Sequence, residues 1–303
     1  MKALVFDLDG TLVDTKHDML DAGNLVFENQ GWTTRLEGFA GLQTAIQGGR
    51  AILRYGLQNE GVSFNEELLK DYYQLYLSNY DKVLDNKSSN YDGVLETLEA
   101  GSIIVDHTTA SVTIAQDVNQ RTQEIGIGFI DAPISGGQSG AEQGTLSIMC
   151  GGTEDDFEKA LPIMGSYGKT MTLIGPSGSG QFTKMVNQIL CAGAIQGAAE
   201  AIAFGLKAGL DMDNVLDAVK SGAAGSWYLQ NRADTMVNDE FDFGFAVDLM
   251  HKDLNLVIDQ AKLIGSETPL TKIMLNSLEE SQHDGDNRMD ATVIIRNYLK
   301  EEK

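Results

Sequence analysis

A lysine followed by two amide side chains one turn later is the first group of residues that could do chemistry. Lys184, Asn187 and Gln188 are spaced i, i+3 and i+4, which places all three on one face of a helix. Met185 and Val186 flank the lysine, so we expect it to be partly buried. Burial disfavours the charged ammonium group and suits a lysine to proton exchange with an alcohol. The alternative is a surface lysine with no catalytic role.

A glycine-rich turn forms a second candidate site. The segment 131–137 leaves a predicted strand and ends in two adjacent glycines, Gly136 and Gly137. Glycines let backbone N–H groups approach a small anion closely, and Ser135 adds a hydroxyl donor. The segment therefore predicts a carboxylate-binding turn, with a simple tight turn as the alternative.

Two carboxylates near the N-terminus form a third candidate site. Asp7 and Asp9 follow a short strand pattern at residues 2–6, at the end of a strand where an α/β sheet opens its ligand crevice. One carboxylate could attack a phosphoryl group and share a divalent cation, while the other moves the proton. Thr11 could hydrogen-bond a phosphate. The pair predicts a divalent-cation site at Asp7 and Asp9.

The elements that must position these groups alternate between strands and helices in the middle of the chain. Such alternation is typical of a parallel α/β sheet. After the acidic pair, the runs of β-forming residues occur at 102–106, 126–131, 146–150 and 171–174.

Helical patterns dominate the remaining sequence. Residues 14–84 carry three of them, the last with a tyrosine stripe that we expect to be core. From residue 180 onward the strand patterns stop. The sequence predicts an α/β plus all-α fold: a partial Rossmann-like parallel sheet with an inserted helical cap block, followed by an all-helical C-terminal domain. The expected domains are residues 1–92, 93–178 and 179–303.

Composition narrows the classes of partner. The 303 residues are 42% hydrophobic and 22% charged, with a formal net charge of −22, which would repel nucleic acid and anionic membranes. The two cysteines, Cys150 and Cys191, favour a reducing cytoplasm over a disulfide framework or metal cluster. The N-terminal apolar run meets acids at once, unlike a signal peptide. The apolar stretch 185–206 carries polar residues and many Ala and Gly, which favours an interior helix over a membrane span.

The N-terminal motif FDLDGTLVDT, residues 6–15, resembles the first motif of the haloacid-dehalogenase superfamily, especially its phosphoglycolate-phosphatase branch. The helical run that follows is similar to that branch's cap, with residues 48–50 where a cap substrate loop would lie. This resemblance implies a phosphatase that uses Mg²⁺ at Asp7 and Asp9. Such enzymes also need a later Ser or Thr, a Lys and a second acidic pair. The resemblance to that family ends before those residues would occur in this chain.

The region 93–303 resembles the β-hydroxyacid dehydrogenase family, which includes 3-hydroxyisobutyrate dehydrogenase. Its motifs are long and occur in the family's order. The matching segments are VDHTTAS (105–111), DAPISGGQSGAEQGTLSIMCGG (131–152), GPSGSGQFTKMVNQ (175–188) and FDFGFAVDLMHKDL (241–254).

This second resemblance implies roles for the candidate residues. The turn Ser135, Gly136 and Gly137 would grip the carboxylate of a small hydroxy acid, and Lys184 would act as acid/base on its hydroxyl. Asn187 would orient the lysine and the substrate. The helical domain would belong to a homo-oligomer interface. Gln188 would lie beside Asn187 at the substrate, and the residues at the nicotinamide end of NAD or NADP would be Thr109, Phe245, Lys252 and Asp253.

The cofactor's phosphate-binding turn is missing from the expected place. Residues 1–92 contain no G-x-G-x-x-G, the turn whose helix N-terminus holds a pyrophosphate. The similar Gly178-Ser179-Gly180 has Thr183 instead of the third glycine, and a P-loop reading fails because Gln181 replaces the lysine. The acidic pair of the first strand would also repel a pyrophosphate. We therefore expect weak or absent NAD(P) binding.

Residues 92–100 fit both families, so we interpret the chain as a chimera joined there. Three functions follow. The first is an NAD(P)-dependent oxidoreductase of the β-hydroxyacid dehydrogenase family with a replaced cofactor half and impaired activity. The others are an Mg²⁺-dependent phosphatase and a non-catalytic oligomer that binds small anions.

Overall fold

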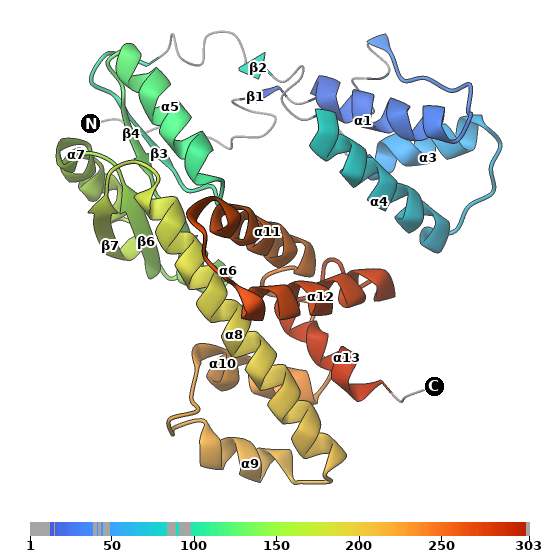
Figure 1. Cartoon of the computed structure of the whole chain (residues 1–303), viewed down its shortest axis with the longest axis vertical. Helices are drawn as coiled ribbons and strands as arrows, with labels where there is room; N and C mark the ends of the chain where they lie inside the picture. Colours follow the sequence, from blue (N-terminus) through green and yellow to red (C-terminus); the bar gives the residue numbers. More distant parts are fainter. Residues whose placement is uncertain are drawn as a thin grey trace. The chain divides into compact units, whose positions relative to one another are not determined.

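The computed structural model describes residues 13–14, 16–38, 41, 44, 49–83, 89–90 and 98–300. The chain divides into two compact units, Met1–Glu99 and Ala100–Lys303, which we describe separately (Figure 1). The acidic pair Asp7 and Asp9 and the neighbouring Thr11 lie outside the described residues, so their predicted roles stay predictions.

The described part of the first unit is helical. It contains α1 (Lys16–Asn29), α3 (Gly49–Asn59) and α4 (Glu66–Val83), with a short antiparallel pair of strands, β1 (Val13–Asp14) and β2 (Ser89–Asn90). The helices pack around buried apolar side chains that include Phe27, Leu53 and Tyr76. The ring of Tyr73 stacks on that of Tyr76 at 5.8 Å between centroids, so the tyrosine stripe belongs to this core as expected.

The second unit begins with a five-stranded sheet. Its strands are β3 (Ile103–Asp106), β4 (Gly128–Asp131), β5 (Ile134–Ser135), β6 (Leu146–Gly151) and β7 (Gly168–Gly175). Each of the four predicted β-forming runs contains a strand, although β3 and β4 begin one and two residues later than predicted. The connecting helices are α5 (Val112–Glu124), α6 (Gly137–Glu142) and α7 (Glu154–Met164).

The predicted Rossmann-like sheet is present, but it is mixed, so the predicted parallel direction holds for only some of its strand pairs. The pairs β3–β4 and β6–β7 are parallel, whereas β5 and β4 each pair antiparallel with β6. Only ten residues, 136–145, separate β5 from β6. A parallel crossover needs about a dozen residues or more, so this short connection returns the chain in the opposite direction.

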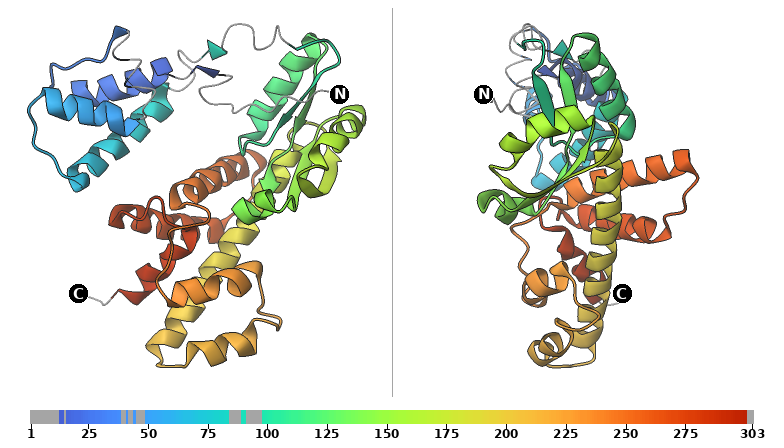
Figure 2. Two further views of the ribbon diagram at one scale, coloured as in Figure 1. Left: turned by 180° about the vertical axis from the view of Figure 1, so that it is seen from behind. Right: turned by 90° about the vertical axis from the view of Figure 1, so that its left-hand side faces the viewer.

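A helical domain completes the second unit. It contains α8 (Ser179–Lys207), α9 (Met212–Val219), α10 (Trp227–Val237), α11 (Val247–Ile264), α12 (Pro269–Asp284), η1 (Ala291–Ile294) and α13 (Ile295–Leu299). Figure 2 shows α8 running from the sheet through this domain. The predicted end of regular strands before residue 180 is confirmed for the described residues.

The long helix α8 links the sheet to the helical core. Its buried residues Ala192, Ile195 and Ile202 contribute to the main apolar cluster of the domain, which α10, α11 and α12 complete. Within the described part of the chain, α8 is the one helix whose length and apolar composition would allow it to cross a membrane, a test that core helices of soluble proteins also pass.

Candidate active site

The buried carboxylate of Asp131 fixes the start of α8. It lies at the end of β4 and is fully buried. Its Oδ1 accepts from the Gly178 N–H at 2.7 Å, and its Oδ2 accepts from the Gln181 N–H at 3.0 Å. Burial raises the pKa of Asp131, and these hydrogen bonds oppose the rise by favouring the ionised form. The carboxylate therefore caps α8 from the sheet.

The glycines at this junction allow close packing of helix and strand. Gly178 has φ +92°, a conformation that side chains rarely adopt. A Cβ on Gly180 would lie 2.4 Å from the Asp131 carbonyl oxygen, and one on Gly151 would lie 2.6 Å from Asp131 Oδ1. Asp131 also accepts from the Gly178 and Gln181 N–H groups, which a phosphate would need. The segment therefore does not act as a dinucleotide turn or a P-loop.

Lys184 lies one turn inside α8 and is buried, with 8% of its surface exposed. Its ammonium Nζ donates to the carbonyl oxygen of Ile134 at 2.8 Å. Burial lowers the pKa of Lys184, and the nearby carboxylate of Asp253 opposes part of this effect. The expectation of a buried lysine with a disfavoured charge is therefore met, and such a lysine can give and take a proton near neutral pH more readily than an exposed one.

The predicted carboxylate turn lies directly after the residue that Lys184 contacts. Ser135 follows Ile134 at the end of β5, and Gly136 and Gly137 are exposed at the start of α6. Gly136 has φ +133° and Gly137 φ +61°, so both positions favour glycine. The chain thus brings Lys184 and the Ser135–Gly137 turn together at one edge of the sheet.

The other predicted residues on α8 bond to each other. The Asn187 amide Nδ2 donates to Gln188 Oε1 at 2.8 Å and to Cys191 Sγ at 3.4 Å. Gln188 is buried, and its Nε2 donates to Asp253 Oδ2 at 2.7 Å. These contacts place Gln188 between Asn187 and Asp253. The orienting role of Asn187 and the substrate contact of Gln188 stay predictions.

Three of the four residues predicted at the nicotinamide end meet across two elements. On α11, Lys252 Nζ lies 3.1 Å from Asp253 Oδ1 and donates to the Thr109 carbonyl oxygen at 2.8 Å. Thr109 belongs to the loop 107–111 at the carboxyl end of β3, where α/β sheets bind nucleotides. Phe245 is 36% exposed, and its backbone N–H donates to Asp290 Oδ2 at 3.0 Å. The role of these four residues at the nicotinamide end of NAD or NADP stays a prediction.

Sequence reasoning missed several residues that hold this site together. In the sequence pattern Asp131 is only the first position of the segment 131–137, and Gln181 is only a departure from a P-loop. His107 was not singled out, yet its Nδ1 donates to the Ala132 carbonyl oxygen at 2.6 Å, and its Nε2 lies 2.8 Å from the Tyr167 hydroxyl. The position of Asp131 and His107 at the ends of strands could have identified them, because polar residues at strand ends face neighbouring loops.

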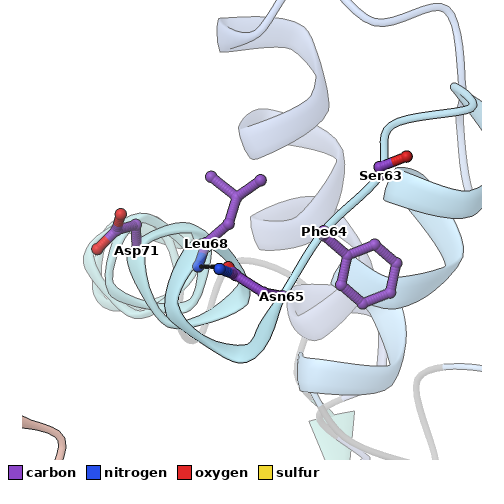
Figure 3. Close-up of a pocket in the computed structure, with 5 residues that line it drawn as sticks. All are labelled: Ser63, Phe64, Asn65, Leu68 and Asp71. Carbon is purple, nitrogen blue, oxygen red and sulfur yellow. Dashed lines mark hydrogen bonds between the residues drawn. The ribbon is translucent and has the colours of Figure 1, made fainter.

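A separate hollow of about 520 Å³ lies in the first unit, lined by Ser63, Phe64, Asn65, Leu68 and Asp71 (Figure 3). Asn65 Oδ1 accepts from the Leu68 N–H at 2.8 Å, which starts α4. Among the described residues, no group of His, Cys, Asp and Glu is arranged to hold a metal. Asp7 and Asp9 lie outside the described residues, so the predicted Mg²⁺ site there stays a prediction.

Two family models match the chain. One describes the NAD-binding domain of 6-phosphogluconate dehydrogenase and matches residues 62–175. The other describes the NAD-binding domain of NADP-dependent 3-hydroxyisobutyrate dehydrogenase and matches residues 178–298. The first match starts before the predicted junction at 92–100. The comparisons lend no support to a haloacid-dehalogenase relationship or to a chimeric origin.

Several relatives share about two thirds of this chain. An uncharacterized oxidoreductase of Shewanella frigidimarina is 42% identical over 208 residues, 69% of this chain and 72% of the relative. The 2-hydroxy-3-oxopropionate reductase of Escherichia coli is 36% identical over 65% of this chain and 67% of its own length. A crystal structure of 3-hydroxyisobutyrate dehydrogenase from Salmonella typhimurium covers 68% of this chain and 73% of its own, with TM-score 0.64 and 31% identity.

The fold and the relatives agree on one class, an oxidoreductase with a Rossmann-like domain and a helical C-terminal domain. The chain belongs to the β-hydroxyacid dehydrogenase family, whose members are NAD(P)-dependent.

Proposed function

We propose that this protein oxidises a small 3-hydroxy acid, or reduces the corresponding semialdehyde, with NAD or NADP. One observation carries the proposal. The buried Lys184 bonds to the carbonyl of Ile134, immediately before the partly exposed Ser135 and the exposed Gly136 and Gly137. A carboxylate on that turn would hold its hydroxyl group near a lysine suited to proton transfer. The name of the Escherichia coli relative, 2-hydroxy-3-oxopropionate reductase, fits a substrate of this size.

The residues of this chain supply binding and proton transfer. The bound cofactor would accept or donate the hydride. The Ser135 hydroxyl and the N–H groups of the turn bind the substrate carboxylate. The neutral form of Lys184, favoured by burial, takes the proton of the substrate hydroxyl during oxidation, and its ammonium form returns a proton during reduction.

We propose further that cofactor binding is weak. The residues that fit the nicotinamide end are present, but residues 1–92 contain no glycine-rich phosphate turn, and Asp131 occupies the N-terminus of α8. Calorimetric titration with NADH and NADPH tests this expectation. Tight binding of either one would contradict it. Asp7→Asn should leave dehydrogenase activity intact or improve cofactor binding if the acidic pair faces the phosphate.

We propose a homo-oligomer formed through the helical domain. Val186, Leu190 and Phe204 on α8 are apolar and 57%, 69% and 75% exposed, respectively. A small anionic substrate, rather than nucleic acid or a membrane, is the proposed partner, and the cytoplasm is the proposed location. The free Cys150 and Cys191 fit a reducing compartment. Light scattering of the purified protein measures the oligomeric state, and a monomer would contradict that proposal.

One assay panel tests the function. It measures NAD(P)-linked oxidation of small 3-hydroxy acids and reduction of their semialdehydes beside Mg²⁺-dependent phosphate release. Turnover in the first arm that falls in Lys184→Ala supports the proposal. Phosphate release that falls in Asp7→Asn would assign the chemistry to the N-terminal region instead. Carboxylate binding without turnover in either arm would indicate a non-catalytic anion-binding protein.

A further inference from the structure

Gln181, three residues before Lys184 on α8, bonds to the loop that contains Thr109. It is 1% exposed. Its side-chain Nε2 donates to the Thr108 carbonyl oxygen at 2.7 Å, and its Oε1 accepts from the Ala110 N–H at 3.0 Å. These are the two bonds that a neighbouring β-strand would make to residues i and i+2. The amide of Gln181 therefore holds both peptides that flank Thr109.

The backbone of Gln181 is anchored as well. The Gln181 N–H donates to the buried carboxylate of Asp131, which also caps the helix through Gly178. The first turn of α8 is thus anchored to the sheet at the residue whose side chain reaches the loop. This anchor fixes the backbone position from which the Gln181 side chain reaches the loop.

Contacts lie on both sides of Lys184 along α8. On one side, Gln181 holds the loop whose Thr109 carbonyl accepts from Lys252. On the other side, Gln188 donates to Asp253, the residue next to Lys252. Gln181 and Gln188 stand three residues before and four after Lys184, so all three share one face of α8. The loop 107–111 and α11 are held against that face at both ends.

We propose that Gln181 is a positioning residue that fixes the Thr109 peptide, and through it Lys252, beside Lys184. The inference rests on the proposed function for its kinetic consequences, whereas the loop contact itself can be measured without turnover. Gln181 has no proton-transfer role, because the nitrogen and the oxygen of its side-chain amide are both engaged by the loop.

Gln181→Met tests the proposal, because methionine keeps the length and burial of the side chain and removes both hydrogen bonds. Gln196→Met is the matched control. Gln196 lies on the same helix, is 5% exposed and bonds to Tyr298 far from the loop. Hydrogen–deuterium exchange of the peptide containing residues 107–111 should accelerate about tenfold or more in Gln181→Met and stay unchanged in the control.

Kinetics and binding separate positioning from a purely structural effect. In Gln181→Met we expect Kd and KM for the dinucleotide to rise about tenfold and kcat to change less than threefold, since Lys184 and the carboxylate turn remain. Gln181→Glu should regain loop protection as the pH falls, because a protonated carboxyl group can donate to Thr108 and still accept from Ala110.

Two results would overturn the proposal: loop exchange in Gln181→Met equal to wild type, or equal changes in exchange and dinucleotide affinity in Gln196→Met. If the wild-type protein shows no dehydrogenase turnover, the proposed function fails, and the exchange comparison still decides whether Gln181 holds the loop.

Discussion

Replacement of Lys184 by methionine should separate activity from stability. Methionine fills a similar volume and cannot exchange a proton. General acid/base groups contribute roughly 10²–10⁴ in rate, so kcat should fall by that factor, which corresponds to about 3–5 kcal/mol in the barrier. Folding should change much less. The variant leaves the Ile134 carbonyl without its bond, at a cost of about 1–3 kcal/mol, and removes the penalty of burying an ammonium group.

The sign of the stability change depends on pH. The folded protein lowers the pKa of Lys184, so the lysine contributes most to stability above its ordinary pKa of 10.5 and loses that contribution as pH falls through the lowered value. Lys184→Met should therefore gain stability relative to wild type as pH falls from alkaline to neutral. Thermal unfolding at several pH values measures this difference.

Lys207→Met is the control, because Lys207 is an exposed lysine in the last turn of the same helix. It should leave both kcat and the unfolding temperature nearly unchanged. The absorbance of the reduced nicotinamide reports turnover. If Lys184→Met keeps more than about a tenth of the wild-type kcat, the loss is below the range expected for an acid/base residue, and the proton transfer belongs to another group.

Two further predictions concern ionisation. Asp253→Asn removes the negative charge that supports the ammonium form of Lys184. The limb of the kcat/KM pH profile that reports this lysine should therefore move to lower pH. A limb that stays in place or moves to higher pH would contradict the assignment. Burial raises the pKa of Cys150 to about 12. Alkylation of the folded protein at neutral pH, followed by mass spectrometry, should therefore label the partly exposed Cys191 first. Rapid labelling of Cys150 would show that its strand opens readily.

The sequence predicted the elements of the second unit well, because its strands and helices carry strong local patterns. Four β-forming runs became strands, and the apolar pattern after residue 180 became a helical domain. Strand direction was harder to predict. The short connection after Ser135 forces β5 and β6 to pair antiparallel, and only its length signals this.

The part of the site that follows a local sequence pattern was predicted, and the part that depends on long-range packing was not. Lys184, Asn187 and Gln188 share a helical face that spacing alone reveals. The bonds of Gln181 to Thr108 and Ala110 join residues about seventy positions apart, and no local pattern encodes them. Contacts of this kind depend on how β3 and α8 pack, which a single sequence leaves open.

The segment after β4 links folding and chemistry in this unit. Asp131 anchors α8, the carbonyl of Ile134 holds the lysine of that helix, and the next three residues form the carboxylate turn. A shift of α8 by a single residue would rotate Lys184 by about 100° around the helix axis, away from Ile134. Gly151 and Gly180 allow the close packing that sets this register, because a Cβ at either position would collide with Asp131. The register of α8 on the sheet therefore determines whether the lysine faces the substrate turn.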